Sequence, residues 1–233
     1  MNLTFSKGKS WAVLVPAMTL PFLASVFYFK LYSDNPLAQL LYAGTKFFTL
    51  VWPLIGSYLF FRVWIPGFQL RHSIHRAALL PGILSGLGIV AIMVVGLHTV
   101  IGDVVVAHGS IIRDKLAELH VLNYYIPFAI FLSFFHSLLE EYYWRFFVYG
   151  HLALLVPRPW AHGLAAVAFA SHHVIVLDEY FPTPWALFFG ASVGLGGLLW
   201  SVMYQQQKTL AGAWVSHMIV DIGLLTIGYL VIF

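Results

Sequence analysis

The sequence contains no cysteine among its 233 residues, which excludes disulfide bonds and thiolate chemistry. Charged residues are also scarce, at 9% of the chain against about 25% in soluble domains. Hydrophobic residues make up 61%, and the mean hydropathy is +0.85. This composition excludes an ordinary soluble globule, a disordered chain and a nucleic-acid-binding protein. It predicts a polytopic membrane protein.

Long apolar runs make up much of the sequence. A helix needs about 20 predominantly apolar residues to cross a bilayer. Runs of suitable length lie near residues 11–28, 37–61, 79–102, 121–156, 160–177, 184–204 and 210–232. The fourth is too long for one straight span, and is either a long tilted helix or a span with an interfacial extension. We therefore predict an all-α bundle of seven transmembrane helices, with room for an eighth, in a single membrane domain over residues 1–233.

Lysine and arginine are distributed unevenly over the connections between the runs. One side carries Lys7, Lys9, Arg62, Arg71, Arg76, Arg145, Arg158 and Lys208, and the other carries Lys30, Arg113 and Lys115. Because short cytoplasmic loops carry an excess of positive charge, this asymmetry predicts a cytoplasmic N-terminus. The compact chain with short loops is typical of a prokaryotic inner (plasma) membrane protein.

Ionisable side chains inside the apolar runs are the natural candidates for chemistry, because each costs about 3 kcal/mol on insertion. Three of the last four runs carry such groups: Glu140, Glu141 and Arg145, then His172 and His173, then His217 and Asp221. At a rise of about 1.5 Å per residue, Glu140, His173, His217 and Asp221 fall in one layer within the membrane. Groups at a similar depth on three helices can converge on one buried polar site.

A spacing of four residues groups several of these side chains on common helix faces. The pairs are His136 with Glu140, Glu141 with Arg145, and His217 with Asp221. For Glu141 and Arg145 the spacing predicts a structural ion pair. Glu140 is turned about 100° away from Glu141. A desolvated carboxylate beside a histidine can serve as a general base, and His136 is placed to tune it.

Three motifs in a fixed order resemble the CPBP family of intramembrane proteases. That family includes the CAAX prenyl protease of the Rce type and bacteriocin-processing relatives. The motifs are Glu-Glu-x-x-x-Arg, Phe-x-x-x-His and His-x-x-x-Asp, carried here by Glu140, Glu141, Arg145, Phe169, His173, His217 and Asp221. The resemblance covers about residues 125–232. Asp221 departs from it, because many members have asparagine there, and Trp144 and Phe146 depart on either side of Arg145.

The resemblance implies an endopeptidase of the glutamate type that forms no covalent intermediate. Glu140 and His173 would activate a water molecule. His217 and Asp221 would orient and stabilise the oxyanion of the tetrahedral intermediate. The supporting residues would be Glu141, Arg145, His136 and His172. The partner would be a membrane-associated peptide or protein, the surroundings the lipid bilayer, and no cofactor would be required.

Other functions could use the same buried groups. A zinc-dependent protease is one, because glutamate, histidine and aspartate are legitimate zinc ligands, although the sequence has no His-Glu-x-x-His motif. A transporter is another, but transporters usually show internal repeats and broken helices, and neither is visible here. The third is a non-catalytic membrane scaffold or immunity protein, against which the complete set of Glu140, His173, His217 and Asp221 argues.

Overall fold

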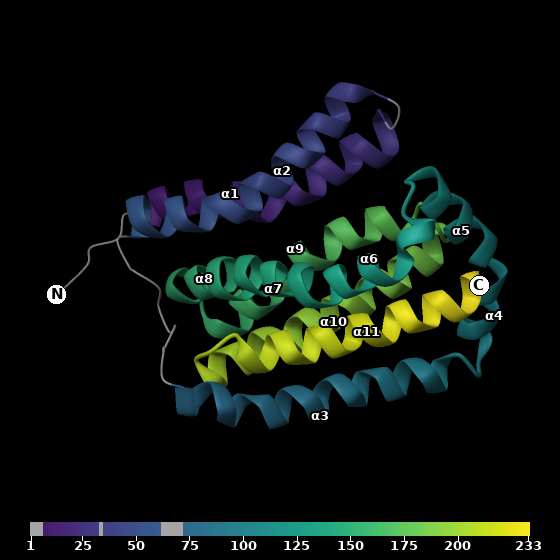
Figure 1. Ribbon diagram of the computed structural model, residues 1–233. Helices are drawn as coiled ribbons and strands as arrows, with labels where there is room; N and C mark the ends of the chain where they lie inside the picture. The colour runs from purple at the N-terminus through teal and green to yellow at the C-terminus, as the bar shows by residue number, and fades with distance from the viewer. Residues whose placement is uncertain (1–6, 33–34, 62–71) are drawn as a thin grey trace. The chain divides into compact units, whose positions relative to one another are not determined.

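The computed structural model describes residues 7–32, 35–61 and 72–233. Within these residues the regular structure is helical and includes no strand, as predicted (Figure 1). The chain forms two compact units, each assembled from two stretches. The first unit is Met1–Phe68 with Tyr142–Lys208, and the second is Gln69–Glu141 with Thr209–Phe233. The single membrane domain stays a prediction.

Six helices in the described part of the chain are long and apolar enough to cross a membrane. They are Ser10–Leu31, Ser73–Gly96, Leu122–Leu155, Arg158–Leu177, Thr183–Gln207 and Ala211–Ile232. The run predicted at 37–61 does form a helix, α2 (Pro36–Ile55) followed by the π-helix η2 (Gly56–Phe61). It is not among the six, because Gln39 and Lys46 interrupt its apolar character. The count of seven spans and the orientation stay predictions, and Arg62 and Arg71 lie outside the described residues.

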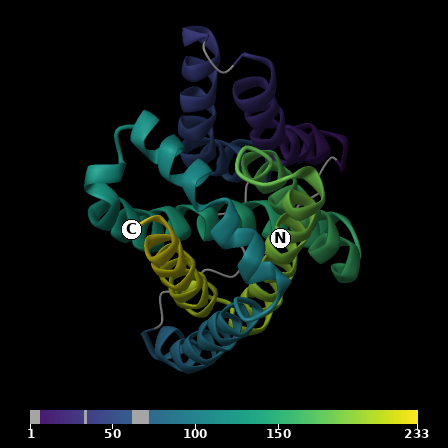
Figure 2. The ribbon, with the colours of Figure 1, turned by 90° about the vertical axis from the view of Figure 1, so that its right-hand side faces the viewer.

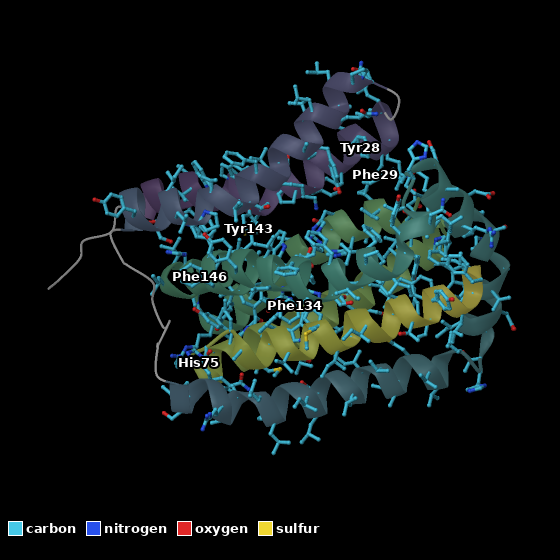
Figure 3. All side chains as sticks on the ribbon, viewed as in Figure 1. Tyr28, Phe29, His75, Phe134, Tyr143 and Phe146 are labelled. Atoms are coloured by element: carbon cyan, nitrogen blue, oxygen red, sulfur yellow. The ribbon has the colours of Figure 1, made fainter. Side chains whose placement is uncertain are left out.

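In the first unit, the N-terminal helix α1 (Lys7–Ser25) continues into the π-helix η1 (Val26–Leu31). Pro21 lies inside α1 and has no N–H to donate to the carbonyl of Ala17, four residues earlier. The hydroxyl of Tyr143, labelled in Figure 3, donates to that carbonyl at 2.8 Å. Trp52 Nε1 donates to the carbonyl of Val13 at 3.2 Å and joins α2 to α1. Side chains thus satisfy polar backbone that the membrane cannot.

The remaining helices of the first unit are α8 (Gly150–Leu155), α9 (Arg158–Leu177) and α10 (Thr183–Gln207). Small residues let α9 and α10 approach closely. A Cβ atom added to Gly194 would lie 3.1 Å from Cβ of Ala170, and one added to Gly197 would lie 2.8 Å from the ring of Phe169. This packing fixes the helix that carries His172 and His173.

A buried polar network also ties α9 to its neighbours. His162 Nδ1 lies 2.7 Å from Ser201 Oγ, and His162 Nε2 lies 2.7 Å from Gln205 Oε1. Tyr149 stacks on the His162 ring, with centroids 4.4 Å apart, and its hydroxyl donates to the same amide oxygen at 2.9 Å. These contacts join α9 to α10 and to the helix of Tyr149, so α9 has a defined register.

The second unit consists of α3 (His72–Gly96), α4 (Val100–Ala107), α5 (Gly109–Glu118), η3 (Leu122–Tyr124), α6 (Tyr125–Phe131), η4 (Leu132–His136), α7 (Ser137–Glu140) and α11 (Ala211–Ile232). Helices α3 and α11 lie side by side (Figures 1 and 2). Gly82 on α3 lies against the backbone of Gly212 on α11. Further along both helices, Val90 on α3 lies against Gly223 on α11. The contacts follow the same order on both helices, so α3 and α11 run parallel.

The long fourth run is a continuous helical stretch from Leu122 to Leu155, 34 residues in length. Two π-helical segments interrupt its α-helical geometry, η4 before α7 and η5 (Glu141–Tyr149) after it. π-Helical turns are rare and frequently occur at functional sites. Here they enclose the four residues of α7, the last of which is Glu140.

Candidate active site

The two adjacent glutamates lie at the junction between α7 and η5. Glu140 ends α7, and Glu141 begins η5. Glu140 is 9% exposed and Glu141 is 0% exposed. Consecutive helical residues point about 100° apart. The doublet therefore presents its carboxylates in two directions.

His217 on α11 lies against both glutamates and is 4% exposed. Its Nδ1 is 2.8 Å from Glu141 Oε1. Its Nε2 is 3.7 Å from Glu140 Oε2 and 3.6 Å from Asp221 Oδ1. Three carboxyl groups thus surround one imidazole ring. We call Glu140, Glu141, His217 and Asp221 the His217 cluster.

His136 approaches the same cluster from the preceding turn. Its Nε2 lies 3.4 Å from Glu140 Oε1, the proximity that the four-residue spacing predicts. Each oxygen of the Glu140 carboxylate therefore has an imidazole nitrogen within 4 Å, from His136 on one side and His217 on the other. Glu140, His217 and Asp221 thus lie together in the second unit, while the predicted convergence of all four groups, His173 included, stays a prediction.

Helix α3 supports the backbone beside His217. Ser85 Oγ donates to Ser216 Oγ at 3.0 Å, and Ser216 is fully buried. At the start of the two helices, His75 Nδ1 lies 2.6 Å from Thr209 Oγ1 (His75 is labelled in Figure 3). These contacts, with the glycine-mediated packing, fix the position of α11. The motifs in the sequence did not indicate any role for α3.

His173 and His172 lie on α9 in the first unit. Nδ1 of His173 is 2.8 Å from the carbonyl oxygen of Phe169, the first residue of its motif. A carbonyl only accepts, so Nδ1–H donates, and the neutral ring carries its lone pair on Nε2. That form can accept a proton from water. His172 stacks on Trp144, with centroids 5.5 Å apart and planes 9° apart. The cooperation of His173 with Glu140 stays a prediction.

Arg145 is buried in the first unit, with 1% of its surface exposed. Its guanidinium carbon lies 4.3 Å from the ring centroid of Phe169 and 5.0 Å from that of Trp200. Such cation–π contacts stabilise a buried cation. The predicted ion pair with Glu141 stays a prediction. No sequence signal distinguished Trp200 from the other tryptophans.

An apolar cavity of about 310 Å³ lies within the second unit. Its walls come from α6, η4 and α11, and include Ala129, Ile130, Ser133, Ile222, Leu225 and Thr226. Ile222 directly follows Asp221 in the chain. Helix α11 thus contributes to the cavity from the residue after Asp221 onward.

A comparison with protein families gives a match. Residues 122–223 match the family described as type II CAAX prenyl endopeptidase Rce1-like. This stretch of the chain is similar to that family. The match confirms the resemblance drawn from the three motifs and contains all the predicted site residues. Comparison with curated proteins and with solved structures gave no match.

The six apolar helices, together with the match over residues 122–223, indicate an integral membrane protein. Helices α1, α2 and α3 lie outside the matched residues. Two of them nevertheless contact matched residues of their own unit. Helix α1 accepts a hydrogen bond from Tyr143, and α3 donates one to Ser216. The N-terminal helices thus support the matched region.

Proposed function

We propose that this protein is an intramembrane endopeptidase that hydrolyses a peptide bond in a membrane-associated peptide or protein. The observation that carries the proposal is the His217 ring, held among three carboxyl groups in a stretch that matches the Rce1-like family. A buried histidine that shares several carboxylates can accept, hold and donate protons. A scaffold protein gains nothing from such a costly arrangement.

The first chemical step is the attack of water on the scissile carbonyl. Glu140 accepts a proton from the water, and His173 holds the water through Nε2. A C–O bond forms, and the carbonyl oxygen becomes an oxyanion. His217, as an imidazolium with a proton on each ring nitrogen, donates a hydrogen bond from Nε2–H to that oxygen. Fixed donors of this kind stabilise the transition state by about 3–4 kcal/mol.

The second step is the collapse of the tetrahedral intermediate. The C–N bond breaks, and the proton held by Glu140 passes to the departing amine nitrogen. The products are a carboxylic acid, which keeps the second hydrogen of the water, and an amine, and Glu140 returns to its ionised form; the acid then passes its proton to the amine. No bond forms between the substrate and the protein. One carboxylate thus serves first as base and then as acid.

Asp221 stands 3.6 Å from Nε2 of His217. An ionised carboxylate cannot donate a hydrogen bond, whereas a protonated carboxyl group or an amide can. We propose that Asp221 contributes to the oxyanion site in its protonated form. That form replaces the amide donor of the family members that have asparagine at this position.

The apolar cavity suggests what flanks the scissile bond. A membrane-associated substrate brings either a lipid group or an apolar segment, and the cavity between α6, η4 and α11 offers an apolar surface for it. A peptide with a prenylated cysteine in a C-terminal CAAX sequence is the first substrate to test, because the matched family is described by that activity.

Two assays test the proposed function. The purified full-length protein is given a farnesylated CAAX peptide and the same peptide without the farnesyl group. In parallel, membrane peptides are compared between cells that express the wild-type protein and cells that express Glu140→Ala. We expect at least one cleavage product that requires Glu140. If neither assay yields such a product, the protease assignment is wrong.

We further propose that the reaction needs no metal ion. The chain lacks the His-Glu-x-x-His arrangement of zinc proteases, and Glu140 with His173 supplies a base and a water-binding group. Cleavage is therefore expected to persist in EDTA, with far less than one zinc per chain by elemental analysis. Activity lost in chelator and restored by zinc would replace this mechanism with the zinc-dependent one.

A further inference from the structure

The contact between Glu141 and His217 determines which ring nitrogen carries a hydrogen. The Glu141 carboxylate is fully buried, and its Oε1 lies 2.8 Å from Nδ1 of His217. An ionised carboxylate only accepts hydrogen bonds. Nδ1 of His217 therefore carries the hydrogen of this bond, and Nε2 is directed toward Glu140 and Asp221.

Packing alone cannot fix this arrangement. The imidazole ring has nearly the same outline after a half-turn about its Cβ–Cγ bond, and that torsion is broad and roughly two-fold. Ser85 and the glycine contacts of α3 hold the backbone next to His217, but they do not distinguish the two ring orientations that this half-turn relates. A hydrogen bond to a buried acceptor does distinguish them. Glu141 is such an acceptor.

We infer that Glu141 is a positioning residue for the reaction: by accepting from Nδ1–H it fixes the ring orientation of His217 and supports the doubly protonated ring, whose Nε2–H is then free to donate to the oxyanion. The inference rests on the proposed function, in which Nε2 of His217 faces the oxyanion. Carboxylates that orient a working histidine in this way are common in metal sites and in hydrolytic triads. The adjacent glutamates thus have separate roles: Glu140 exchanges protons with the water and the product, and Glu141 orients His217.

Histidine-selective ¹⁵N NMR of the full-length protein in nanodiscs tests the inference without any substrate. His217→Gln identifies the signal of His217. In the wild type we expect Nδ1 to be protonated and hydrogen-bonded. In Glu141→Leu we expect the ring to lose this preference and populate the Nε2–H tautomer. Glu179→Gln, a glutamate change just after the C-terminus of α9 in the first unit, is the matched control and is expected to leave the signal unmoved.

Glu141→Gln keeps the shape of the side chain and covers the case in which Glu141→Leu fails to fold. Its amide oxygen still accepts from Nδ1–H but carries no charge, so the Nδ1 proton resonance is expected to move upfield. A His217 spectrum identical to the wild type in either folded variant would overturn the inference.

Turnover provides the second readout. For Glu141→Leu we expect kcat to fall about 10- to 100-fold with KM within about twofold of the wild type, the usual effect of removing an orienting partner. Glu141→Gln is expected to retain more activity than Glu141→Leu. A folded Glu141→Leu variant with wild-type kcat would contradict the inference. Full activity of a Glu140→Gln variant would refute the proposed function instead, while the NMR result would still decide the role of Glu141.

Discussion

Two groups of carboxylates in this protein surround a basic side chain, and they differ in burial. In the first group, Lys30 Nζ lies 2.8 Å from Asp178 Oδ2 and 2.7 Å from Glu179 Oε1. We call these three residues the Lys30 cluster. Their side chains are 21–31% exposed, and they join the end of η1 to the end of α9. Each carboxylate has a permanently charged partner and access to solvent.

The His217 cluster has the opposite character. Its histidine and Glu141 are almost completely buried, and three carboxyl groups share one ring whose charge can change. A lysine at the surface keeps its proton throughout the physiological range, whereas a histidine gains and loses one. The number of charges is similar in the two clusters. Burial and a shared, titratable partner therefore distinguish a site for proton transfer from a structural contact.

The sharpest test of this contrast is the same chemical change in both clusters. Glu140→Gln nearly preserves side-chain shape but removes the base, so we expect cleavage to fall by about a thousandfold or more. Glu179→Gln makes the same change in the Lys30 cluster and is expected to leave cleavage unchanged. The measurement is initial rate per folded protein, with folding checked by thermal unfolding in detergent. Equal rates for both variants would remove the distinction.

A buried cation should matter far more for stability than an exposed one. Arg145→Ala removes a guanidinium group packed between Phe169 and Trp200 and leaves a cavity where its alkyl stem lay. We expect a loss of about 2–4 kcal/mol in unfolding free energy. Arg145→Met, which refills most of the volume, should recover part of it. Unchanged thermal stability of Arg145→Ala would show that the cation–π contacts contribute nothing.

The sequence predicted contacts within one helix better than contacts between helices. The spacing of four residues placed His136 near Glu140 and Asp221 near His217, and both pairs lie within 3.6 Å. The contact of Glu141 with His217 joins residues 76 positions apart. Periodicity carries no information about which helices pack together, so the sequence assigned Glu141 only to Arg145.

In the fold, likewise, the sequence predicted local structure better than contacts between helices. Apolar runs predicted the helices, including the full 34 residues of the fourth run. They did not predict the π-helical segments, because a one-residue change in hydrogen-bond register leaves the apolar pattern almost unaltered. They also gave no indication that Tyr143 satisfies the carbonyl of Ala17, which Pro21 leaves without its helical donor. Such compensation depends on a neighbouring helix and appears only in three dimensions.

Substitutions in the apolar cavity of the second unit allow substrate binding to be separated from chemistry. Ala129 lines the cavity, and a tryptophan there would fill much of its volume. For Ala129→Trp we expect KM to rise about tenfold with little change in kcat, because the apolar contacts are made equally in the ground and transition states. Ala117→Trp on α5, an exposed position in the same unit, is the control. An unchanged KM would exclude the cavity from substrate binding.

Substitutions of Asp221 test how the oxyanion site tolerates a change of hydrogen-bond donor. Asp221→Asn keeps the shape and supplies an N–H donor in every protonation state, so we expect activity within about threefold of the wild type. Asp221→Ala removes the donor and should lose more, about tenfold to a hundredfold. If Asp221→Asn is as inactive as Asp221→Ala, the ionised carboxylate itself is needed, and the proposed protonated donor is wrong.

The smallest effect is expected in the Lys30 cluster. Lys30→Met should reduce unfolding free energy by about 1 kcal/mol or less, as is usual for partly exposed ion pairs. Lys115→Met, which removes a more exposed pair with Glu118 at 3.0 Å, is the matched control and should cost less still. A loss of several kcal/mol in Lys30→Met would place the cluster among the buried determinants of the fold.

The pH dependence of that small effect has a definite sign. The hydrogen bond from Lys30, followed by one from Thr183, holds the pKa of Asp178 below its ordinary value of 3.8. A lowered carboxyl pKa in the folded state contributes stability that is fully present above the unfolded value and disappears as pH falls through the folded value. The difference in melting temperature between wild type and Lys30→Met should therefore be constant from pH 8 to about pH 5 and shrink below about pH 4. A difference that grows on acidification would mean that Lys30 does not stabilise the ionised form of Asp178.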